Sequence, residues 1–545
     1  MGKARRRGGR NRLSCERGSA NDQRGCPRGR LWRACLRLRE ASVELITEVL
    51  ARQARERGSR VFVCHEGQRL TYAEFDAATN RVAHALRALG ACKGDRVTLA
   101  MTNSVEYLLA AFGVLKAGAV LHPVNPALGS RELSYVLNHA TPRFVVTLPE
   151  TVQGIDRAAL QLEQPPQWLS FGGGPDTIDL WPEIHRAPET PVEVPLSADD
   201  PSTLLYTSGT TGNPKGVLFH HRSTGAAGKH FIETLQITEH DVILAVTPLF
   251  HGNAWGAVVT ALQAGGTVAF PRAFSASQFW PLVHEVGATV LYTLGTILAI
   301  LLAQPPNELE RTSSLRVILG LGSAPLREQI RSRFGVHHVA ECFGSTDAGV
   351  VTIEPVGQEP RPGSCGPPVP GVLIRIVDDA GRDLPPRQVG EIAVRSPHSL
   401  AEYFRDPEQT RFAVREGWFF TGDLGFVDED GWLYFVDRKR DVIRRGGENV
   451  SSLFVEKVLR EHPNVAEVAV IGVPDPVLGQ EIKAFVVPRG HVTEEELRAF
   501  AAARLAKFQV PRYWEFRESL PKTPTQRVEK YKLRAEAGPQ GPLLG

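Results

Sequence analysis

The sequence has no apolar run long enough to span a bilayer. The longest run, from Leu291 to Ala303, is interrupted by Thr293, Gly295 and Thr296 and is typical of a buried helix. A signal-peptide apolar core, an internal repeat and a C-x-x-C pair are also missing, and the seven cysteines show no metal-ligand spacing. These absences argue against a disulfide scaffold, a cysteine-based zinc site and a membrane span. They favour reduced thiols in a cytoplasmic protein.

Acidic residues are scarce at the start of the chain. Residues 1–40 hold thirteen basic and three acidic residues, so the remainder is net negative although the total charge is +3. We expect a disordered leader, or a start codon placed too early, with a presequence for the mitochondrial matrix as the alternative. A nucleic-acid-binding arm is disfavoured because Trp32 is the one aromatic residue among the arginines, and no nucleic-acid partner is predicted.

The chain after the leader has the pattern of a globular α/β protein. The full sequence of 545 residues is too long for a single core, and its content of 42% hydrophobic and 23% charged residues is ordinary for a globular protein. Thr71 and Glu74 form a capping box for one helix, strand 97–101 follows, and Ser104 caps the next helix. Strands that alternate with such helices predict parallel sheets covered by helices. Residues 154–200, rich in Pro, Gly and Asp, are expected to be loops.

The stretch 206–216 reads Tyr-Thr-Ser-Gly-Thr-Thr-Gly-Asn-Pro-Lys-Gly between apolar segments, which predicts a loop between two short strands. Glycines let its backbone approach a ligand, hydroxyls and N–H groups can surround phosphate oxygens, and Lys215 adds a positive charge. The Walker A spacing does not fit this loop, and a plain surface turn would not explain the run of hydroxyls. The candidate nucleotide-binding residues are Thr207, Ser208, Gly209, Thr210, Thr211, Gly212 and Lys215.

This loop resembles the phosphate loop of the adenylate-forming superfamily, which includes acyl-CoA synthetases, luciferases and stand-alone adenylation domains. The resemblance implies an α/β fold: a large N-terminal domain of αβ-layered sheets with a small β-barrel subdomain, then a small mobile α+β C-terminal domain. It predicts a leader at 1–40, an AMP-binding domain at 41–437, a hinge at 438–440, a C-terminal domain at 441–535 and a tail at 536–545.

The resemblance also implies a reaction in two halves. A carboxylate attacks the α-phosphate of ATP to give an acyl-adenylate and pyrophosphate, and a thiol, usually that of coenzyme A, then displaces AMP. Because negative charge gathers on phosphate oxygens, the first half needs Mg²⁺, cations and hydrogen-bond donors held in position. The predicted co-substrates and cofactor are therefore ATP, coenzyme A and Mg²⁺.

Two further motifs resemble the family's adenine and phosphate sites. In relatives the first motif, which is at 322–324 here, lies against adenine. In the second motif, at 343–347 here, an aromatic ring stacks on adenine, a threonine contacts the α-phosphate, and an acid holds Mg²⁺. That acid is here Asp347, assisted by Thr207, and it is one methylene shorter than the usual glutamate. Each segment taken singly also has a purely structural explanation. The first could be a turn that ends a strand, and the second could be a Thr-Asp pair that caps a helix. The candidates are Gly322, Ser323 and Ala324, then Phe343, Gly344, Thr346 and Asp347.

The Thr-Gly-Asp sequence ending at Asp423 resembles the family's ribose clamp, although a β-turn aspartate would have the same pattern. By resemblance, Arg438 would contact ribose or phosphate, and Arg440 occupies the pivot position of the interdomain hinge. Gly446 and Gly447 would lie beside the pantetheine arm of coenzyme A. A charged interdomain linker explains the basic segment, but it does not explain the two glycines.

Two positions concern catalysis directly. His251 matches the histidine or aromatic gate beside the acyl site, where it would orient the carboxylate or switch when the thiol arrives, although a histidine after an apolar strand is often structural. Arg527 occupies the place of the family's catalytic lysine in the closing motif and would serve, with Lys215 and Thr346, as a catalytic group. Losing one electrostatic donor in such a step typically costs about 3 kcal/mol. Lys530 is the alternative cation.

We therefore expect an AMP-forming acyl-CoA ligase with a carboxylic acid substrate. An apolar pocket favours a fatty or other hydrophobic acid, while the stretch 250–280 also resembles the crotonobetaine/carnitine-CoA ligase branch. The alternatives are a stand-alone enzyme that loads a carrier protein, and a weakly active nucleotide-binding homologue. The sequence does not give the oligomeric state. The expected pocket residues are Trp255, Phe274, Phe279, Trp280 and Leu291.

Overall fold

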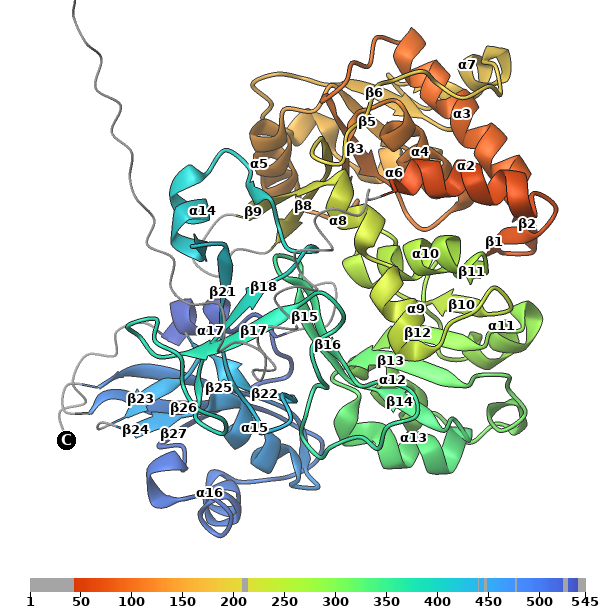
Figure 1. Ribbon diagram of the computed structural model, residues 1–545. Coiled ribbons are helices and arrows are strands. Elements are labelled where there is room, and N and C mark those ends of the chain that lie inside the picture. The colour runs from red at the N-terminus through yellow and green to blue at the C-terminus, as the bar shows by residue number, and fades with distance from the viewer. Residues whose placement is uncertain are drawn as a thin grey trace, which may run out of the picture. The chain divides into compact units, whose positions relative to one another are not determined.

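The computed structural model describes residues 44–207, 214–439, 441–445, 448–475, 478–522 and 528–537 (Figure 1). The predicted leader, most of the phosphate loop (208–213), Arg440, Gly446, Gly447 and Arg527 lie outside these ranges. By internal contacts the chain from Val43 to Gly545 forms one compact unit. The structure confirms the predicted α/β fold class, while the domain boundaries stay a prediction.

A seven-stranded sheet forms the middle of the described chain, in the order β14-β13-β12-β10-β11-β1-β2. All its neighbouring strands are parallel except β1 and β2. Its interior strands are buried on both faces, as expected where helices cover a parallel sheet. The strands are β1 Val61–His65, β2 Gln68–Thr71, β10 Val242–Ala245, β11 Thr267–Ala269, β12 Val290–Leu294, β13 Val317–Leu321 and β14 His338–Ala340.

An eight-stranded sheet has the order β19-β9-β8-β4-β3-β5-β6-β7. Near one edge it contains β8 and β9, the two strands that flank the predicted phosphate loop and are named here the phosphate hairpin. Its strands are parallel from β8 to β7, while β9 pairs antiparallel with both β8 and β19. The strands are β3 Arg96–Ala100, β4 Val120–Val124, β5 Phe144–Thr147, β6 Gln167–Ser170, β7 Ile178–Asp179, β8 Pro201–Thr207, β9 Lys215–His220 and β19 Glu402–Tyr403.

Helices alternate with these strands as the sequence predicts. The Thr71–Glu74 capping box begins α3, and the Ser104 side chain accepts a hydrogen bond from the Tyr107 N–H at the start of α4. The helices are α2 Ile46–Arg57, α3 Tyr72–Ala88, α4 Val105–Lys116, α5 Ser130–Ala140, α6 Pro149–Gly154, α7 Leu180–Arg186, α8 His221–Ala226, α9 Lys229–Leu235, α10 Gly252–Ala264, α11 Phe279–Val286, α12 Gly295–Ala303, α13 Arg327–Phe334 and α14 Pro407–Ala413.

Two sequence-based expectations are wrong. The apolar run 291–303 is not one buried helix: its first part is strand β12, and α12 begins at Gly295, where an added Cβ would lie 2.2 Å from the Gly322 carbonyl oxygen. Residues 154–200 are not only loops, because β6, β7 and α7 lie there. β6 extends the parallel sheet beside β5, and Leu169 fills the core, which outweighs the polar composition around it.

Three smaller arrangements follow, which are antiparallel except that β27 pairs parallel with β26 in the last of them. β15 Cys342–Ser345 pairs with β16 Gly349–Ile353, and a curled sheet has the order β17-β18-β21-β20, with β22 on β21. The C-terminal sheet has the order β24-β23-β26-β25, with β27 on β26. The remaining strands are β17 Leu373–Val377, β18 Gly390–Arg395, β20 Val414–Arg415, β21 Trp418–Val427, β22 Leu433–Arg438, β23 Ile443–Arg445, β24 Glu448–Val450, β25 Val465–Asp475, β26 Gly479–Pro488 and β27 Tyr513–Phe516. The C-terminal helices are α15 Ser452–Arg460, α16 Glu494–Ala502 and α17 Lys530–Ala537.

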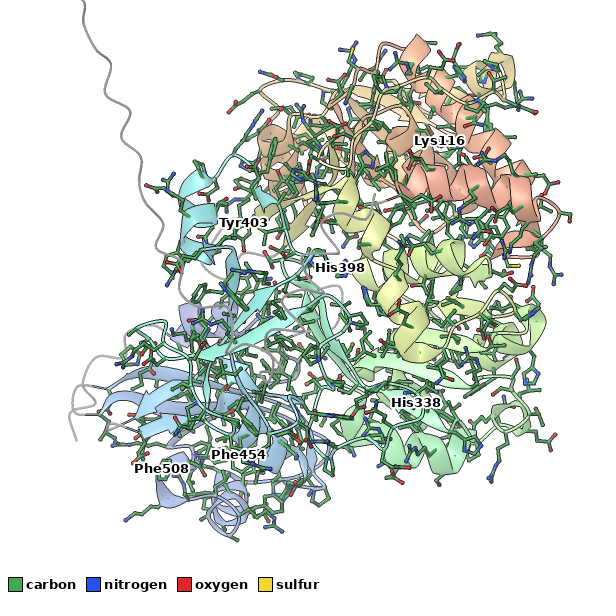
Figure 2. All side chains as sticks on the ribbon, viewed as in Figure 1. Lys116, His338, His398, Tyr403, Phe454 and Phe508 are labelled. Atoms are coloured by element: carbon green, nitrogen blue, oxygen red, sulfur yellow. The ribbon has the colours of Figure 1, made fainter. Side chains whose placement is uncertain are left out.

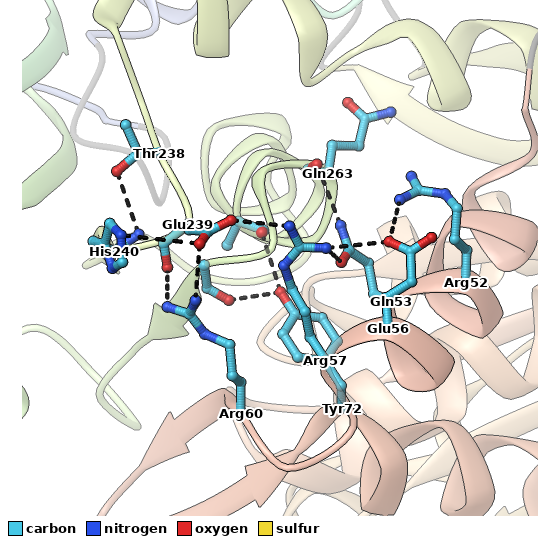
Figure 3. Close-up of polar contacts among 12 residues, drawn as sticks. Arg52, Gln53, Glu56, Arg57, Arg60, Tyr72, Thr238, Glu239, His240 and Gln263 are labelled. Atoms are coloured by element: carbon cyan, nitrogen blue, oxygen red, sulfur yellow. Dashed lines mark hydrogen bonds and ion pairs between the residues drawn. The ribbon is translucent and has the colours of Figure 1, made fainter.

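A polar network attaches α2 to the loop before β10 and to the end of α10 (Figure 3). Arg57 Nη2 lies 2.9 Å from Glu239 Oε2, and the Tyr72 hydroxyl donates to the Gly266 carbonyl at 2.6 Å. The Arg57 guanidinium also donates to Gln53 Oε1 at 3.0 Å. Because Tyr72 is fully buried, its hydroxyl needs this acceptor, so the network fixes the first helices on the seven-stranded sheet.

Candidate active site

The phosphate loop connects two antiparallel strands, as the sequence predicts. Thr207 ends β8 and faces Lys215, which begins β9. Lys215 Nζ lies 5.4 Å from the centre of the Tyr403 ring, which belongs to the neighbouring strand β19 and is labelled in Figure 2. The strand pairing therefore places a cation at the base of the hairpin and holds its stem against an aromatic ring.

Asp347 lies in the turn between β15 and β16, next to the exposed Thr346. Its Oδ1 accepts a 2.8 Å hydrogen bond from the Tyr403 hydroxyl, and its carbonyl oxygen accepts from the Leu400 N–H at 2.8 Å. Burial raises the pKa of Asp347, whereas the Tyr403 hydrogen bond and the positive charges of Lys215 and Arg438 oppose the rise. Asp347, the predicted metal ligand, therefore lies close enough to the predicted phosphate-binding cations Lys215 and Arg438 for their charges to act on its pKa.

Asp423 and Arg438 face each other across β21 and β22. Arg438 Nε lies 3.7 Å from Asp423 Oδ1, and the Asp423 side chain is 15% exposed. The Asp423 N–H donates to Thr421 Oγ1 at 3.1 Å, which fixes the turn of the Thr-Gly-Asp motif. Together with Lys215 and Asp347, these two residues form a cluster of two cations and two acids drawn from four motifs of the sequence.

The predicted adenine residues lie directly after β13, at 322–324, and within β15, at Phe343 and Gly344. Gly322 has φ +80°, in the left-handed region, and no atom lies within 4 Å of the place a Cβ would take. Gly344 is needed for close packing, because a Cβ there would lie 2.5 Å from the Gly349 carbonyl oxygen. Phe343 is 6% exposed and stacks on Phe435 with ring centres 5.7 Å apart. Stacking of Phe343 on adenine stays a prediction.

His251 precedes α10 and lines a small cavity of about 20 Å³, roughly the space of one water molecule. Burial lowers the pKa of His251 to about 4, so the ring is neutral at physiological pH. Its Nε2 has no hydrogen-bond partner among the described residues. The walls of the cavity are mostly apolar and include Tyr107, Leu121, Pro123, Leu205, Leu249, Phe250 and Trp255.

The predicted acyl pocket is only partly correct. Trp255 lines the His251 cavity, but Phe279, Trp280 and Leu291 are buried at 2%, 4% and 1% exposure in the core between the seven-stranded sheet and its helices. The Trp280 ring packs edge-on against Phe334 at 4.9 Å. The sequence could not separate these core aromatics from pocket aromatics, because both follow the same apolar pattern.

Two residues that the sequence did not single out, Tyr403 and Glu341, contact the predicted site, whereas Lys530, the predicted alternative cation, is engaged elsewhere. Tyr403 contacts both Lys215 and Asp347, and its sequence surroundings gave no signal of this role. The Glu341 carboxylate binds the Gly322–Ala324 turn through backbone N–H groups. Lys530, the alternative to Arg527, lies 2.7 Å from Glu456 Oε1 with its side chain 11% exposed, so it is engaged inside the C-terminal α/β unit.

The described residues contain no group of three or more His, Cys, Asp and Glu side chains arranged to hold a metal ion. Mg²⁺ does not require one, since it is usually bound through one or two carboxylates, water and substrate phosphates. The carboxylate of Asp347 and the hydroxyl of Thr207 are hard oxygen ligands of this kind. The donor set therefore fits Mg²⁺. Within the described ranges, no helix is both long and apolar enough to cross a membrane.

Comparisons with known proteins agree with this architecture. The family model for AMP-binding enzymes matches residues 50–404, and that for the AMP-binding enzyme C-terminal domain matches residues 455–527. The fatty acid–acyl-carrier-protein ligase ScoC of Streptomyces coeruleorubidus is 33% identical, over 91% of this chain and 97% of its own. The crotonobetaine/carnitine–CoA ligase of Citrobacter koseri is 33% identical, over 87% of this chain and 95% of its own.

Among solved structures, ATP-bound MatB from Rhodopseudomonas palustris is similar to this chain with a TM-score of 0.82 and 30% identity, covering 91% of this chain and 99% of MatB. A large α/β part with parallel sheets and a smaller C-terminal α+β part are thus the architecture of a nucleotide-dependent ligase. The chain belongs to the AMP-binding enzyme family, whose acyl-CoA ligases are its relatives.

Proposed function

We propose that the chain is an ATP-dependent acyl-CoA ligase. It activates a carboxylic acid as an acyl-adenylate with release of pyrophosphate, and then transfers the acyl group to coenzyme A with release of AMP. The observation that carries the proposal is the cluster of Lys215, Asp347, Asp423 and Arg438, in which two cations and two acids from separate motifs lie within one electrostatic neighbourhood.

Each member of the cluster has a part in the first half-reaction. Lys215 and Arg438 offset negative charge on the phosphates, while Asp423 accepts hydrogen bonds from the ribose hydroxyls. Thr346, exposed in the turn beside Asp347, is placed to donate to an α-phosphate oxygen. Asp347 and Thr207 would hold Mg²⁺, which supplies positive charge to the phosphate oxygens when bound. Arg527 supplies the further cation expected from the closing motif.

The second half-reaction needs a thiol and an acyl group that meet beside His251. In the first half-reaction the neutral, buried ring of His251 orients the carboxylate through hydrogen bonding instead of charge. The apolar walls of the His251 cavity suit a hydrophobic acid, whereas a quaternary ammonium acid such as carnitine would need its cation to lie on the aromatic faces of Tyr107, Phe250 or Trp255. The small volume of the cavity indicates that a longer acyl chain requires the walls to move apart.

The test is AMP release from ATP by the purified full-length chain with coenzyme A and a panel of carboxylic acids. We expect AMP with apolar acids, and octanoate to compete more strongly than carnitine. Absence of AMP with every acid would overturn the proposal. If carnitine competed more strongly than octanoate, the proposed ligase activity would stand, but the proposed preference for a hydrophobic acid would be wrong.

A second candidate is an enzyme that loads a carrier protein, because the similar ScoC carries that activity in its name. Pyrophosphate exchange with an acid but no acyl-CoA product, restored to turnover by a phosphopantetheinylated carrier protein, would favour it. A weakly active nucleotide-binding homologue is the third candidate, suggested by Arg527 in place of lysine. In that case Arg527→Lys would raise the adenylation rate sharply, and no gain would remove its support.

A further inference from the structure

The turn between β13 and α13 is held by one buried carboxylate. The Gly322 N–H donates to Glu341 Oε1 at 2.7 Å, and the Ala324 N–H donates to Glu341 Oε2 at 2.8 Å. The Cys342 N–H adds a third hydrogen bond to Oε1 at 3.1 Å. Glu341 is 5% exposed, so both oxygens are committed to backbone donors.

Glu341 is itself fixed from behind. Its backbone N–H donates to Glu354 Oε2 at 2.8 Å, and Glu354 forms an ion pair with Arg327, the first residue of α13. Arg327 Nε also donates to the Val339 carbonyl at 3.0 Å. His338, labelled in Figure 2, contacts the Glu354 carbonyl through Nε2 at 3.2 Å. Contacts from β14 and α13 therefore fix the position of Glu341 through Glu354 and Arg327.

The turn is also limited on its other side, where the Gly322 carbonyl oxygen packs against Gly295 at the start of α12. What stays open is the face of Gly322 from which a side chain would project, since no atom lies within 4 Å of that place. With the Gly322 and Ala324 N–H groups bonded to Glu341 and open space on the other face of Gly322, a planar ring can approach the backbone of the turn closely.

Only a carboxylate can accept hydrogen bonds on both of its terminal side-chain atoms from the N–H groups of this turn. A carboxylate has two acceptor oxygens, whereas an amide of the same shape has one acceptor and places its NH₂ against one of the backbone donors. Burying a carboxylate is costly unless donors surround it, and burial raises the pKa of Glu341 while these N–H groups oppose the rise. A turn that only ended a strand would not need this group.

We propose that Glu341 is a positioning residue for nucleotide binding: it holds the Gly322–Ala324 turn in the conformation whose open face receives the purine base. The inference rests on the proposed function, which places ATP in this site. Glu341 contacts no reacting atom, so its loss weakens nucleotide binding equally in the ground state and the transition state.

The test compares Glu341→Gln with the wild type in steady-state kinetics and in direct binding of AMP. We expect the KM for ATP and the Kd for AMP to rise about tenfold, with kcat within about twofold and the KM values for acid and coenzyme A unchanged. Glu341→Asp, which keeps the charge but shortens the reach, should fall between the two. The matched control is Glu310→Gln, which removes another buried carboxylate, paired with Arg333.

Hydrogen exchange separates the positioning role from general stability. Glu341→Gln should speed exchange of the 320–326 backbone amides, and Glu310→Gln should not. Faster exchange with unchanged AMP binding would overturn the proposal, and it would show that the base binds elsewhere. A lowered melting temperature with neither change would overturn it as well. If neither Glu341 variant folds, AMP must still protect the 320–326 amides of the wild type, and no protection would contradict the proposal.

Discussion

The Tyr403 hydroxyl donates a 2.8 Å hydrogen bond to Asp347 Oδ1, and the same ring lies 5.4 Å from Lys215 Nζ. Tyr403 thus joins the base of the phosphate hairpin to the acid predicted to bind Mg²⁺. The contact also accounts for how an aspartate, one methylene shorter than the usual family glutamate, is held in a fixed orientation.

Tyr403→Phe keeps the ring beneath Lys215 but removes the donor to Asp347. A hydrogen bond to a charged group contributes about 1.5–3 kcal/mol, so we expect the Mg²⁺ concentration for half-maximal AMP formation to rise about tenfold or more. Mg²⁺ titration of the reaction measures this. Tyr434→Phe is the matched control, because its hydroxyl donates to Asp428 at 3.2 Å outside the cluster. Equal effects of both variants would contradict the assignment.

Arg527→Ala should slow adenylation while sparing thioester formation. Loss of one electrostatic donor costs about 3 kcal/mol, which predicts a drop of about a hundredfold in pyrophosphate exchange. Transfer from a synthetic acyl-adenylate to coenzyme A should change less than about threefold, since that half-reaction no longer involves the triphosphate. Equal loss in both half-reactions would show that Arg527 supports structure instead.

Lys530→Met should destabilise the chain instead of acting on catalysis alone. The substitution leaves Glu456, whose side chain is 3% exposed, with Arg460 as its remaining ion-pair partner among the described residues. We expect a loss of about 2–3 kcal/mol, below the usual value for a broken buried pair because Arg460 stays. Urea unfolding measures it, with the exposed Lys532→Met as control. Normal stability with abolished adenylation would make Lys530 the catalytic cation.

Acid should destabilise the fold through its buried histidines. Burial lowers the pKa of His221 and His398 to about 4 and that of His122 to about 3. An unfolded histidine binds a proton near pH 6.5, so below that pH the unfolded state holds more protons. The free energy of unfolding therefore falls as pH drops from about 6.5 toward 4, by up to about 1.4 kcal/mol per pH unit for each histidine.

His221→Gln removes one of these titrations and should reduce that slope by about one proton. His240→Gln, at a side chain 81% exposed, is the control and should leave the slope unchanged. Urea unfolding at several pH values between 7 and 4 gives both slopes. Identical slopes for wild type and His221→Gln would contradict the prediction.

Patterns of neighbouring residues in the sequence correctly predicted helix starts and the two strands beside the predicted phosphate loop. The capping box at Thr71, the cap at Ser104 and the two strands around the phosphate loop follow from neighbouring residues, and the structure has all of them. The run beginning at Leu291 misled because a strand inside a parallel sheet is as continuously apolar as a buried helix. Only the strand order, which pairs β12 with β10 and β13, decides between them.

The candidate site divides in the same way. Motifs located Lys215, Asp347 and Asp423, because their chemistry appears in short stretches of sequence. Tyr403 contacts Asp347, which is 56 residues away in the sequence, and Glu341 contacts Gly322, which is 19 residues away. No local sequence pattern predicts either contact. Long-range backbone and hydroxyl contacts of this kind become visible only when the strands are placed together.

A crystal structure of the chain with ATP tests the central claim most directly. The account predicts the ribose hydroxyls at Asp423, the phosphates along 207–215 with Lys215 and Arg438, and the base against the Gly322–Ala324 turn. A nucleotide bound away from both the phosphate hairpin and Asp423 would contradict it.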